Sequence, residues 1–462
     1  MSAIKPDAAT RDRENNHPRA RLIIPGALVA LPAIFFYATL FKRLVNIPRI
    51  DDYGVLEFLN QLVQLKSAGD KFWFFLAAQH NEYKLFFAEG ISWLQLALVG
   101  HANFAQLCII GDGAVLLLAF ILWSMFLPGE RDLAKRLAYF VPVAWLLFQL
   151  QYYETLNCAL AALQNLWVIV FSLAAIYCVL RPGWKAFAGS MVFFALAIAA
   201  SGNGFMLLPV GLLTLASRGQ FVRAAGWLAV SSGCGAAYAY RYNLMSSQSL
   251  PGRSVLIALL HLRPFYAISF LGNAGAIVEG SSLTLAICLM LGTVLLLLFG
   301  WMTKQGYYRR NPAVSSGVLF LLITAVGVAG LRSDLGLEQS LDSRYTIYGA
   351  LLLIFAWMAV AEELVQHRNE RVLDNAPYLA MAVAAIVFSL CVDEVGVLAL
   401  YRERGELVAG MTAFEHPSTP QTNEGPVLED GDDSAEWKIF RERVRADLNE
   451  SIRLGVYEPP KF

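Results

Sequence analysis

Two adjacent carboxylates follow the first long apolar run of the chain, in the string "PRIDDYG". Asp51 or Asp52 could act as a general base, because an ionised carboxylate can take the proton of an attacking hydroxyl group. The sequence does not choose between them. As an alternative, the pair could be a solvated helix end that caps a helix beginning near Gly54.

A second polar string, "QHNEYK", interrupts a long aromatic run and carries His80, Asn81, Glu82 and Lys84. We expect His80 to position other groups rather than to catalyse. Glu82 could contact a sugar, hold a divalent ion or pair with Lys84. No spacing of His and carboxylate residues indicates a metal site. The sequence therefore assigns no cofactor and leaves metal dependence open.

Three further polar segments lie between apolar runs. They are "QYYETLNCALAALQN" with Glu154, Asn157 and Gln164, "SGNGF" with Asn203, and "SRYTIY" with Arg344 and Tyr345. Arg344 offers a planar, permanently charged fork that suits a phosphate. As an alternative to phosphate binding, Arg344 could extend its charged end to the membrane surface or form an ion pair with Asp342. Together these groups favour group transfer from a membrane-bound phosphate donor to a hydroxyl acceptor.

The composition sets the class of protein. Hydrophobic residues make up 57% of the chain and charged residues only 16%, and the mean hydropathy is +0.51. Repeated long apolar runs at this composition predict an all-α polytopic membrane protein. The net charge of zero gives no basic surface for nucleic acid. Because no Gly-rich phosphate loop or dinucleotide fingerprint occurs, a cytoplasmic nucleotide-dependent enzyme is disfavoured.

The apolar runs predict about eleven transmembrane helices, at about 20 residues each. The expected spans are 22–42, 104–127, 137–156, 158–180, 185–201, 204–217, 224–242, 281–301, 314–331, 346–365 and 376–397. These bounds divide the chain into a cytoplasmic segment 1–21, a transmembrane domain 22–397 with a first outer loop 43–103, and a tail 398–462. The first span, which follows a basic leader, is expected to be retained as a helix rather than cleaved.

The distribution of Lys and Arg decides how segment 71–99 is placed. If it does not cross and the amino terminus is cytoplasmic, most loop Lys and Arg fall on the cytoplasmic side. Crossing would invert this and bury Glu82 and Lys84 at a cost of roughly 2.5–3.5 kcal/mol each. We therefore expect interfacial helices at 54–65, 71–78 and 85–99, with the polar segments gathered on the outer side.

These features carry a family resemblance. An acidic pair beyond the first span, interfacial helices in the first outer loop and a many-span body resemble the GT-C superfamily of integral-membrane glycosyltransferases, over roughly residues 22–397. The order of "QHNEYK", "YYETLNCALAALQ", "SGNGF" and "SRYTIY" is similar to that of poorly characterised bacterial members, which show "HNEHR"-like and "WEN…Q"-like strings. Here Tyr83 and Lys84 replace the His and Arg, and Tyr153 replaces the Trp.

The resemblance implies transfer of a sugar from a polyprenyl-phosphate donor to a glycan or lipid acceptor. The reaction would occur at the periplasmic face of a bacterial inner membrane, with Asp51 or Asp52 as the base. The expected substrate contacts are His80, Asn81, Glu82, Lys84, Glu154, Asn157, Gln164, Asn203, Arg344 and Tyr345. Two other classes stay open: a flippase or transporter of polyprenyl-linked lipids, and a noncatalytic protein of polysaccharide assembly.

The resulting spatial prediction is a single water-filled pocket at the outer boundary of the membrane. It should bring together Asp51, Asp52, His80, Asn81, Glu82, Glu154, Asn157 and Arg344. Asp112 lies deep in the second span, where an ionisable side chain usually has a function or a partner. We expect it either to form part of the lower wall of the pocket or to pair with another residue inside the bundle.

The tail is expected to lie on the periplasmic side. After a polar loop, "SAEWKIFRERVRADLNESIRLG" predicts an amphipathic helix with an apolar stripe at spacings of three and four residues. Ser434 would cap its start and Gly455 its end. This helix either stabilises the fold from the periphery or covers the pocket.

Overall fold

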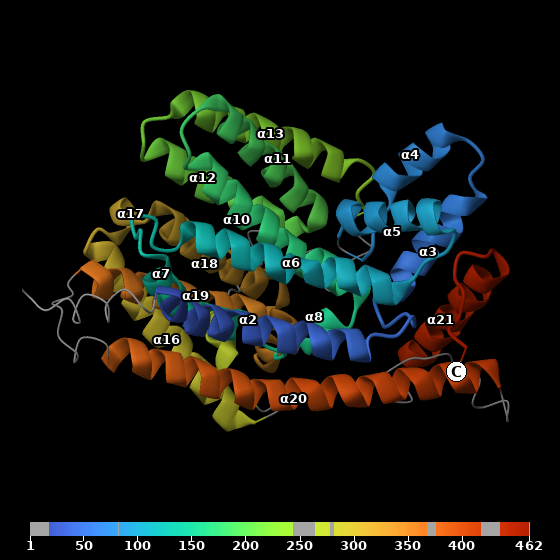
Figure 1. Cartoon of the computed structure of the whole chain (residues 1–462). Helices are drawn as coiled ribbons and strands as arrows, with labels where there is room; N and C mark the ends of the chain where they lie inside the picture. Colours follow the sequence, from blue (N-terminus) through green and yellow to red (C-terminus); the bar gives the residue numbers. More distant parts are fainter. Residues whose placement is uncertain are drawn as a thin grey trace, which may run out of the picture.

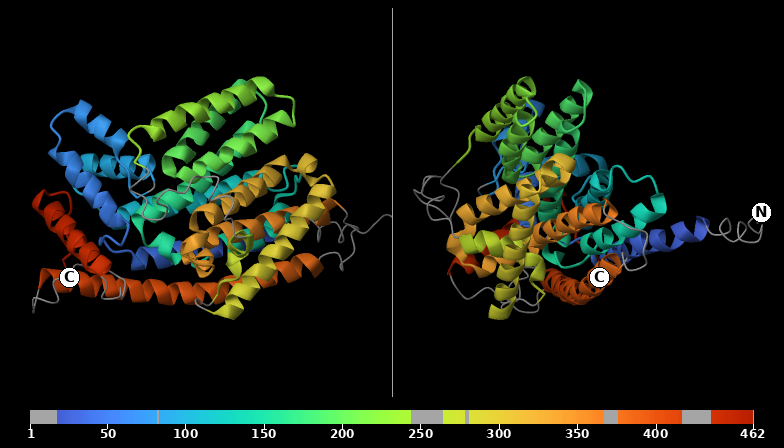
Figure 2. Two further views of the ribbon diagram at one scale, coloured as in Figure 1. Left: turned by 180° about the vertical axis from the view of Figure 1, so that it is seen from behind. Right: turned by 90° about the vertical axis from the view of Figure 1, so that its left-hand side faces the viewer.

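The computed structural model describes residues 18–81, 83–243, 264–277, 281–366, 376–416 and 435–461. Within these ranges the regular elements are helices, joined by turns and two isolated β-bridges. Figure 1 shows most of the helices running roughly along one direction. Helices α11 (Trp184–Ala200), α12 (Leu207–Ala216) and α13 (Phe221–Ala239) lie on one side of this bundle, opposite α16 (Ser282–Lys304) and α20 (Ala376–Glu415) (Figure 2).

The other helices follow the chain in this order. They are α2 (Pro18–Arg43), α3 (Asp52–Gln64), α4 (Ala68–Ala77), α5 (Phe86–Val99), α6 (Phe104–Met125), α7 (Leu133–Leu147), α8 (Tyr153–Leu156), α9 (Ala159–Ala161), the π-helical η1 (Ala162–Leu166), α10 (Trp167–Val179), the 3₁₀ turn η2 (Gly202–Met206), α15 (Pro264–Leu271), η4 (Asn273–Gly275), α17 (Tyr307–Arg310), α18 (Pro312–Arg332), η5 (Ser333–Leu335), η6 (Glu338–Leu341), η7 (Ser343–Tyr345), α19 (Thr346–Gln366) and α21 (Ala435–Arg453).

Seven helical segments are long and apolar enough to cross a membrane. They are Leu22–Arg43, Phe104–Met125, Ala159–Val179, Ser282–Lys304, Pro312–Arg332, Ser343–Gln366 and Ala376–Glu415. The chain is therefore a polytopic helical membrane protein. Each of the eleven expected spans contains a helix, but four of these helices, namely α7, α11, α12 and α13, are not among the seven.

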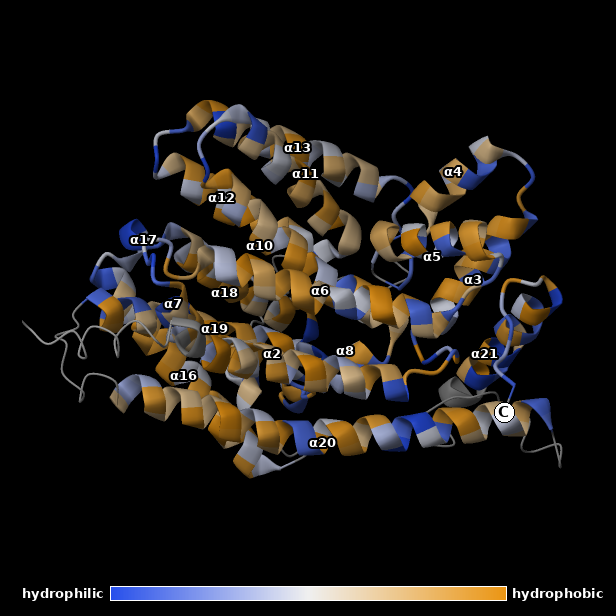
Figure 3. Ribbon diagram, viewed as in Figure 1, coloured by the Kyte–Doolittle hydropathy of each residue, from blue (hydrophilic) through white to orange (hydrophobic). Residues whose placement is uncertain are grey.

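Apolar side chains cover the outside of the bundle as well as its core. Ile23, Leu116, Phe120 and Leu297, for example, are more than half exposed, and hydrophobic residues follow the outer faces of α2, α6 and α16 (Figure 3). In contrast, most residues of α10 and α19 are buried. Helices that are apolar on their outer faces as well as in the core, as α2, α6 and α16 are, are typical of a bundle surrounded by lipid.

The expected span 137–156 ends earlier than the hydropathy suggested. Helix α7 stops at Leu147. The Leu150 N–H then donates to Asp393 Oδ1 of α20 at 2.8 Å, and Gln149 Nε2 donates to the Leu146 carbonyl at 3.0 Å. Because these partners satisfy polar groups outside the helix, the chain can turn here and start α8.

The last expected span continues well beyond residue 397. Helix α20 has 40 residues, so it is about 60 Å long, roughly twice the thickness of a bilayer hydrocarbon core. Its second half is anchored because Leu407 and Met411 are buried in a core shared with the first-loop helices. Packing in this second core, which hydropathy does not register, explains why the helix continues beyond the span predicted from sequence.

Helix α21 confirms the amphipathic helix predicted in the tail. Its stripe residues Val444 and Leu448 are buried in the same second core. Asn60 Nδ2 of α3 donates to the Asp447 carbonyl at 3.2 Å, and Gly455 follows the helix with a φ of +68°, a conformation that glycine adopts readily. Ser434 lies outside the described residues. The helix therefore packs on α3 (Figure 1).

The three helices expected in the first loop are present as α3, α4 and α5. Helix α3 is the most buried of them, with Leu56 and Leu59 at its core. Helix α4 has no buried residue, and its Phe72 and Trp73 are about half exposed. Helix α21 thus holds α3 from Glu57 onward, through the Arg443–Glu57 ion pair and the Asn60 hydrogen bond.

Candidate functional site

A cavity of about 500 Å³ opens where several helix ends meet. Its wall comes from the segment after α2, the turn between α4 and α5, the start of α9 and η1, the turn between α11 and α12, the ends of α13 and α18, and the start of α19. Among the residues predicted from sequence, Asp51, His80, Asn81, Glu154, Gln164, Asn203, Arg344 and Tyr345 line it. Segments almost 300 residues apart in the chain therefore share one polar cavity.

Asp51 and His80 form the most accessible titratable pair of the site. Their Oδ1 and Nε2 atoms are 3.9 Å apart, and the Asp51 side chain is 46% exposed. Desolvation raises the pKa of Asp51, but His80 and the charges of Arg344 and Arg49 outweigh it, so the pKa lies below its usual value. Asp51 makes no side-chain cap to α3. It therefore presents an ionised carboxylate to the cavity.

The backbone around His80 explains how the imidazole reaches Asp51. His80 and Tyr83 exchange two backbone hydrogen bonds of 2.8 and 2.9 Å, which close a tight turn. A Cβ atom on Gly54 would lie 2.3 Å from His80 Nδ1 and Cε1. The ring can rest on α3 only because residue 54 has no side chain, so Gly54 is a site residue that polarity-based reasoning missed.

Glu154 and Arg344 meet in another part of the lining. The Arg344 N–H donates to Glu154 Oε2 at 3.3 Å, and Arg344 Nη2 pairs with Asp342 Oδ2 at 2.8 Å. Ser343 Oγ donates to the Gln151 carbonyl at 2.7 Å and accepts from the Glu154 N–H at 3.3 Å. Burial raises the pKa of Glu154, while Arg49 and Arg344 oppose the rise. The ion pair expected as an alternative for Arg344 is thus present, and its guanidinium still lines the cavity.

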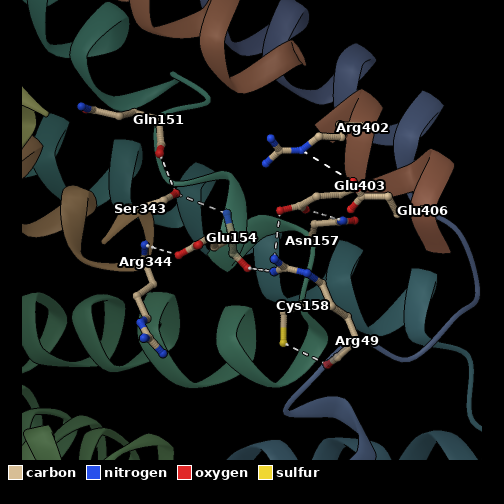
Figure 4. A network of polar contacts seen from close by, with 10 residues as sticks. All are labelled: Arg49, Gln151, Glu154, Asn157, Cys158, Ser343, Arg344, Arg402, Glu403 and Glu406. Carbon is tan, nitrogen blue, oxygen red and sulfur yellow. Dashed lines mark hydrogen bonds and ion pairs between the residues drawn. The ribbon is translucent and has the colours of Figure 1, made fainter. Parts of the chain in front are cut away.

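Arg49 is the main site residue that the sequence reasoning missed. It is only 7% exposed. Its Nη2 pairs with Glu403 Oε1 at 2.9 Å and its Nη1 donates to the Glu154 carbonyl at 3.2 Å (Figure 4). The feature of the sequence that could have identified Arg49 is its position two residues before Asp51, in "PRIDD". Its counter-ion could not be found because Glu403 lies in the segment expected to be tail.

Asp52 does not share the cavity, so this part of the predicted pocket is wrong. Its side chain accepts the Leu160 N–H at 2.8 Å and the Arg49 N–H at 3.1 Å. It is 1% exposed, and burial raises its pKa to about 6 although these hydrogen bonds oppose the rise. Asp52 thus holds the start of α3 against α9, and Asp51 is the member of the pair that can meet a substrate.

Lys84 and Asn157 also turn away from the cavity. Lys84 is fully buried. Its Nζ donates to the Leu76 carbonyl at 2.6 Å and to the Tyr240 carbonyl, and burial lowers its pKa. Asn157 Nδ2 donates to Glu403 Oε2 at 2.9 Å. Both therefore support the wall from behind, and Glu82 lies outside the described residues.

The remaining predicted residues complete the polar lining. Gln164, in the π-helical turn η1, donates to Ser201 Oγ at 3.4 Å. Asn203 donates to the Tyr348 hydroxyl, also at 3.4 Å. A π-helical turn often marks a functional site, because it re-aims side chains out of the regular helix. The lining residues outside the predicted set include Arg332, Tyr83, Tyr238 and Tyr348.

Asp112 does not line the cavity and its carboxylate has no hydrogen-bond partner, so the structure supports neither of its two expected roles. It is buried in α6, and neither carboxylate oxygen has a hydrogen-bond partner. The nearby Tyr37 hydroxyl donates instead to its backbone carbonyl, at 2.8 Å. Among the described residues, no group of three or more His, Cys, Asp and Glu side chains could hold a metal ion.

The geometry defines a class: a polytopic helical membrane protein with an open cavity, lined by several polar side chains, where helix ends meet. The chain matches no protein-family model. A search of curated proteins likewise found no match.

Proposed function

We propose that the protein is a membrane glycosyltransferase that moves a sugar from a polyprenyl-phosphate donor to a hydroxyl of a glycan or lipid acceptor. The observation that carries the proposal is the cavity that is lined both by the partly exposed Asp51–His80 pair and by Arg49, Arg332 and Arg344. A base for the acceptor and cations for a phosphate are the two requirements of this chemistry. The cavity volume is also typical of small-molecule sites.

In the proposed reaction, the acceptor oxygen attacks the anomeric carbon of the donor sugar. Asp51 takes the hydroxyl proton as the new carbon–oxygen bond forms. The bond between the anomeric carbon and the phosphate oxygen breaks, and its electron pair leaves with the polyprenyl phosphate. Arginine guanidinium groups balance the charge that develops on that phosphate, while His80 holds Asp51 in its ionised form.

The proposed setting is the periplasmic face of a bacterial inner membrane, with the amino terminus in the cytoplasm. All residues of the proposed chemistry lie at one end of the bundle. A transporter of polyprenyl-linked lipids would instead need polar groups near the middle of its helices.

The test is transfer by the purified protein in lipid nanodiscs, with a panel of short polyprenyl-phosphate sugars and glycan or lipid acceptors. We expect Asp51→Asn to lower turnover by about 100-fold or more, the scale of general-base catalysis. Asp70→Asn is the matched control, since Asp70 is an exposed carboxylate on α4 of the same loop. Equal turnover of the two variants would contradict the assigned base. The absence of transfer with every donor would favour a transport or assembly role.

A further inference from the structure

Arg49 is a charged side chain built into the wall of the cavity. It is 7% exposed and belongs to the cavity lining. Glu403 and the Glu154 carbonyl hold its two terminal nitrogens, whereas its Nε atom is buried with no hydrogen-bond partner. An unused donor on a buried cation is costly. The guanidinium is therefore fixed in position but not fully satisfied.

Two other guanidinium groups reach the same cavity. Arg344 pairs with Asp342 at 2.8 Å, and Arg332 Nη2 donates to the Tyr83 hydroxyl at 3.2 Å. Glu403 and Asp342, which neutralise two of these arginines, are not part of the lining. The carboxylates of Asp51 and Glu154 also line the cavity, so the three guanidinium groups support a phosphoryl site as donors of charge-assisted hydrogen bonds and not as uncompensated positive charge.

We propose that Arg49 is a ligand-binding residue and that it forms a phosphoryl-binding subsite with Arg332 and Arg344. The sequence indicated phosphate binding for Arg344, which is paired with Asp342 as Arg49 is with Glu403. Arg49 adds a rigid, buried fork whose position is set by α20. The phosphoryl group belongs either to a polyprenyl lipid or to free phosphate. This inference takes its probes from the proposed function, but it requires binding only and no transfer.

The experiment is equilibrium binding of farnesyl phosphate and of inorganic phosphate to the full-length protein in nanodiscs. We expect Arg49→Gln to weaken binding about tenfold or more, as for the loss of one charge-assisted hydrogen bond. Arg402→Gln is the charge-matched control, because Arg402 is exposed on the same helix as Glu403 and its ion pair with Glu406, at 3.8 Å, lies at the surface. It should stay within about twofold of the wild type.

Removal of Arg49 alone leaves Glu403 as a buried, unpaired charge, and this variant could fail to fold. The double variant Arg49→Gln/Glu403→Gln avoids the problem, since two neutral amides can keep a hydrogen bond at the same place. It should show the same weakened binding. Arg49→Lys should lie between the wild type and Arg49→Gln, because an ammonium keeps the charge but loses the fork.

A loss with both probes supports a subsite for which the phosphoryl group is sufficient. A loss with farnesyl phosphate alone supports a subsite for lipid-linked phosphate. Wild-type affinity in the double variant overturns the proposal, as does a wild-type protein that binds neither probe. If binding depends on Arg49 but no donor supports transfer, the transferase proposal fails and the subsite stands. If transfer proceeds while binding ignores Arg49, only the subsite is removed.

Discussion

The adjacent carboxylates Asp51 and Asp52 have opposite environments. Asp52 accepts two backbone N–H groups in a sealed position, whereas Asp51 faces His80 across 3.9 Å in the cavity. A base must reach its substrate and be ionised before it can act. Both conditions favour Asp51, so its ionisation and its contact with His80 are the features to test at the scale of single residues.

Activity should persist into acid conditions and fall only below the usual pKa of an aspartate, which is about 3.9. The pKa of Asp51 is lowered in the folded protein, mainly by His80 against the effect of burial. The ionised base is therefore present above that low pKa and is lost as the pH falls through it. Removing the imidazole in His80→Ala should shift the acid limb of kcat/KM to higher pH. An unshifted limb would show that His80 does not tune this base.

A single methyl group on Gly54 should disturb the same pair. In Gly54→Ala, the new Cβ would overlap the His80 ring at 2.3 Å, so the ring must move. We expect turnover to fall by about 10- to 100-fold, as displacements of about 1 Å at an active site can cause. The control is Gly90→Ala on α5, where the new Cβ would make an ordinary 3.8 Å contact with Phe75. If both variants keep full turnover, the position of His80 is not important.

The sequence predicted the membership of the site better than its geometry. Polar side chains in an apolar chain are conspicuous, and Asp51, His80, Glu154 and Arg344 were found in this way. The choice between Asp51 and Asp52 depends on the Leu160 N–H, more than 100 residues away, so local pattern could not make it. Arg49 was missed for the same reason, because its meaning comes from Glu403 on a distant helix.

At the scale of elements, helix α20 holds the wall of the site in position. Its Asp393 accepts the Leu150 N–H before α8, and its Glu403 contacts both Arg49 and Asn157 (Figure 4). These contacts fix the segment that carries Glu154. Hydropathy predicted only the apolar first half of α20, because the second half is stabilised by a core that it shares with residues of α3 and α21 rather than by lipid.

Glu403→Gln should destabilise the protein by about 3–5 kcal/mol, since it leaves Arg49 as a buried cation without a counter-ion. The matched control is Glu406→Gln, less than one turn further along α20, where the side chain is 48% exposed and the expected change is within about 0.5 kcal/mol. Thermal unfolding in nanodiscs measures both. Equal midpoints for the two variants would mean that the Arg49–Glu403 pair contributes nothing to stability.

Deletion of residues 416–462 separates the two roles considered for the tail. Helix α21 covers α3 through Val444 and Leu448 and does not line the cavity. We therefore expect a lower unfolding temperature but an unchanged acceptor preference, measured below that temperature. A broader range of acceptors in the truncated protein would instead support a lid.

At the scale of the whole molecule, the contacts across the cavity constrain how the chain threads the membrane. Arg49 follows α2, and its Nη1 donates to the Glu154 carbonyl just before α9 and α10. Both points must lie on the same side of the bundle. Between these two points the chain crosses the bundle away from that side along α6. It must therefore return to the same side along the shorter α7. In the same way Asn203, after α11, and Tyr242, after α13, line the cavity together.

These contacts favour eleven crossings over seven, and the turn between α12 and α13 tests the difference. With eleven crossings and a cytoplasmic amino terminus, Ser217 lies in the cytoplasm. With seven, α10 would run outward and Ser217 would lie outside. We expect a cysteine at Ser217→Cys, in a background without the six native cysteines, to react with an impermeant maleimide only after the membrane is permeabilised. Ser281→Cys, at the start of α16, should react in intact cells and serves as the control. Labelling of Ser217→Cys in intact cells would contradict the count of eleven crossings and favour seven.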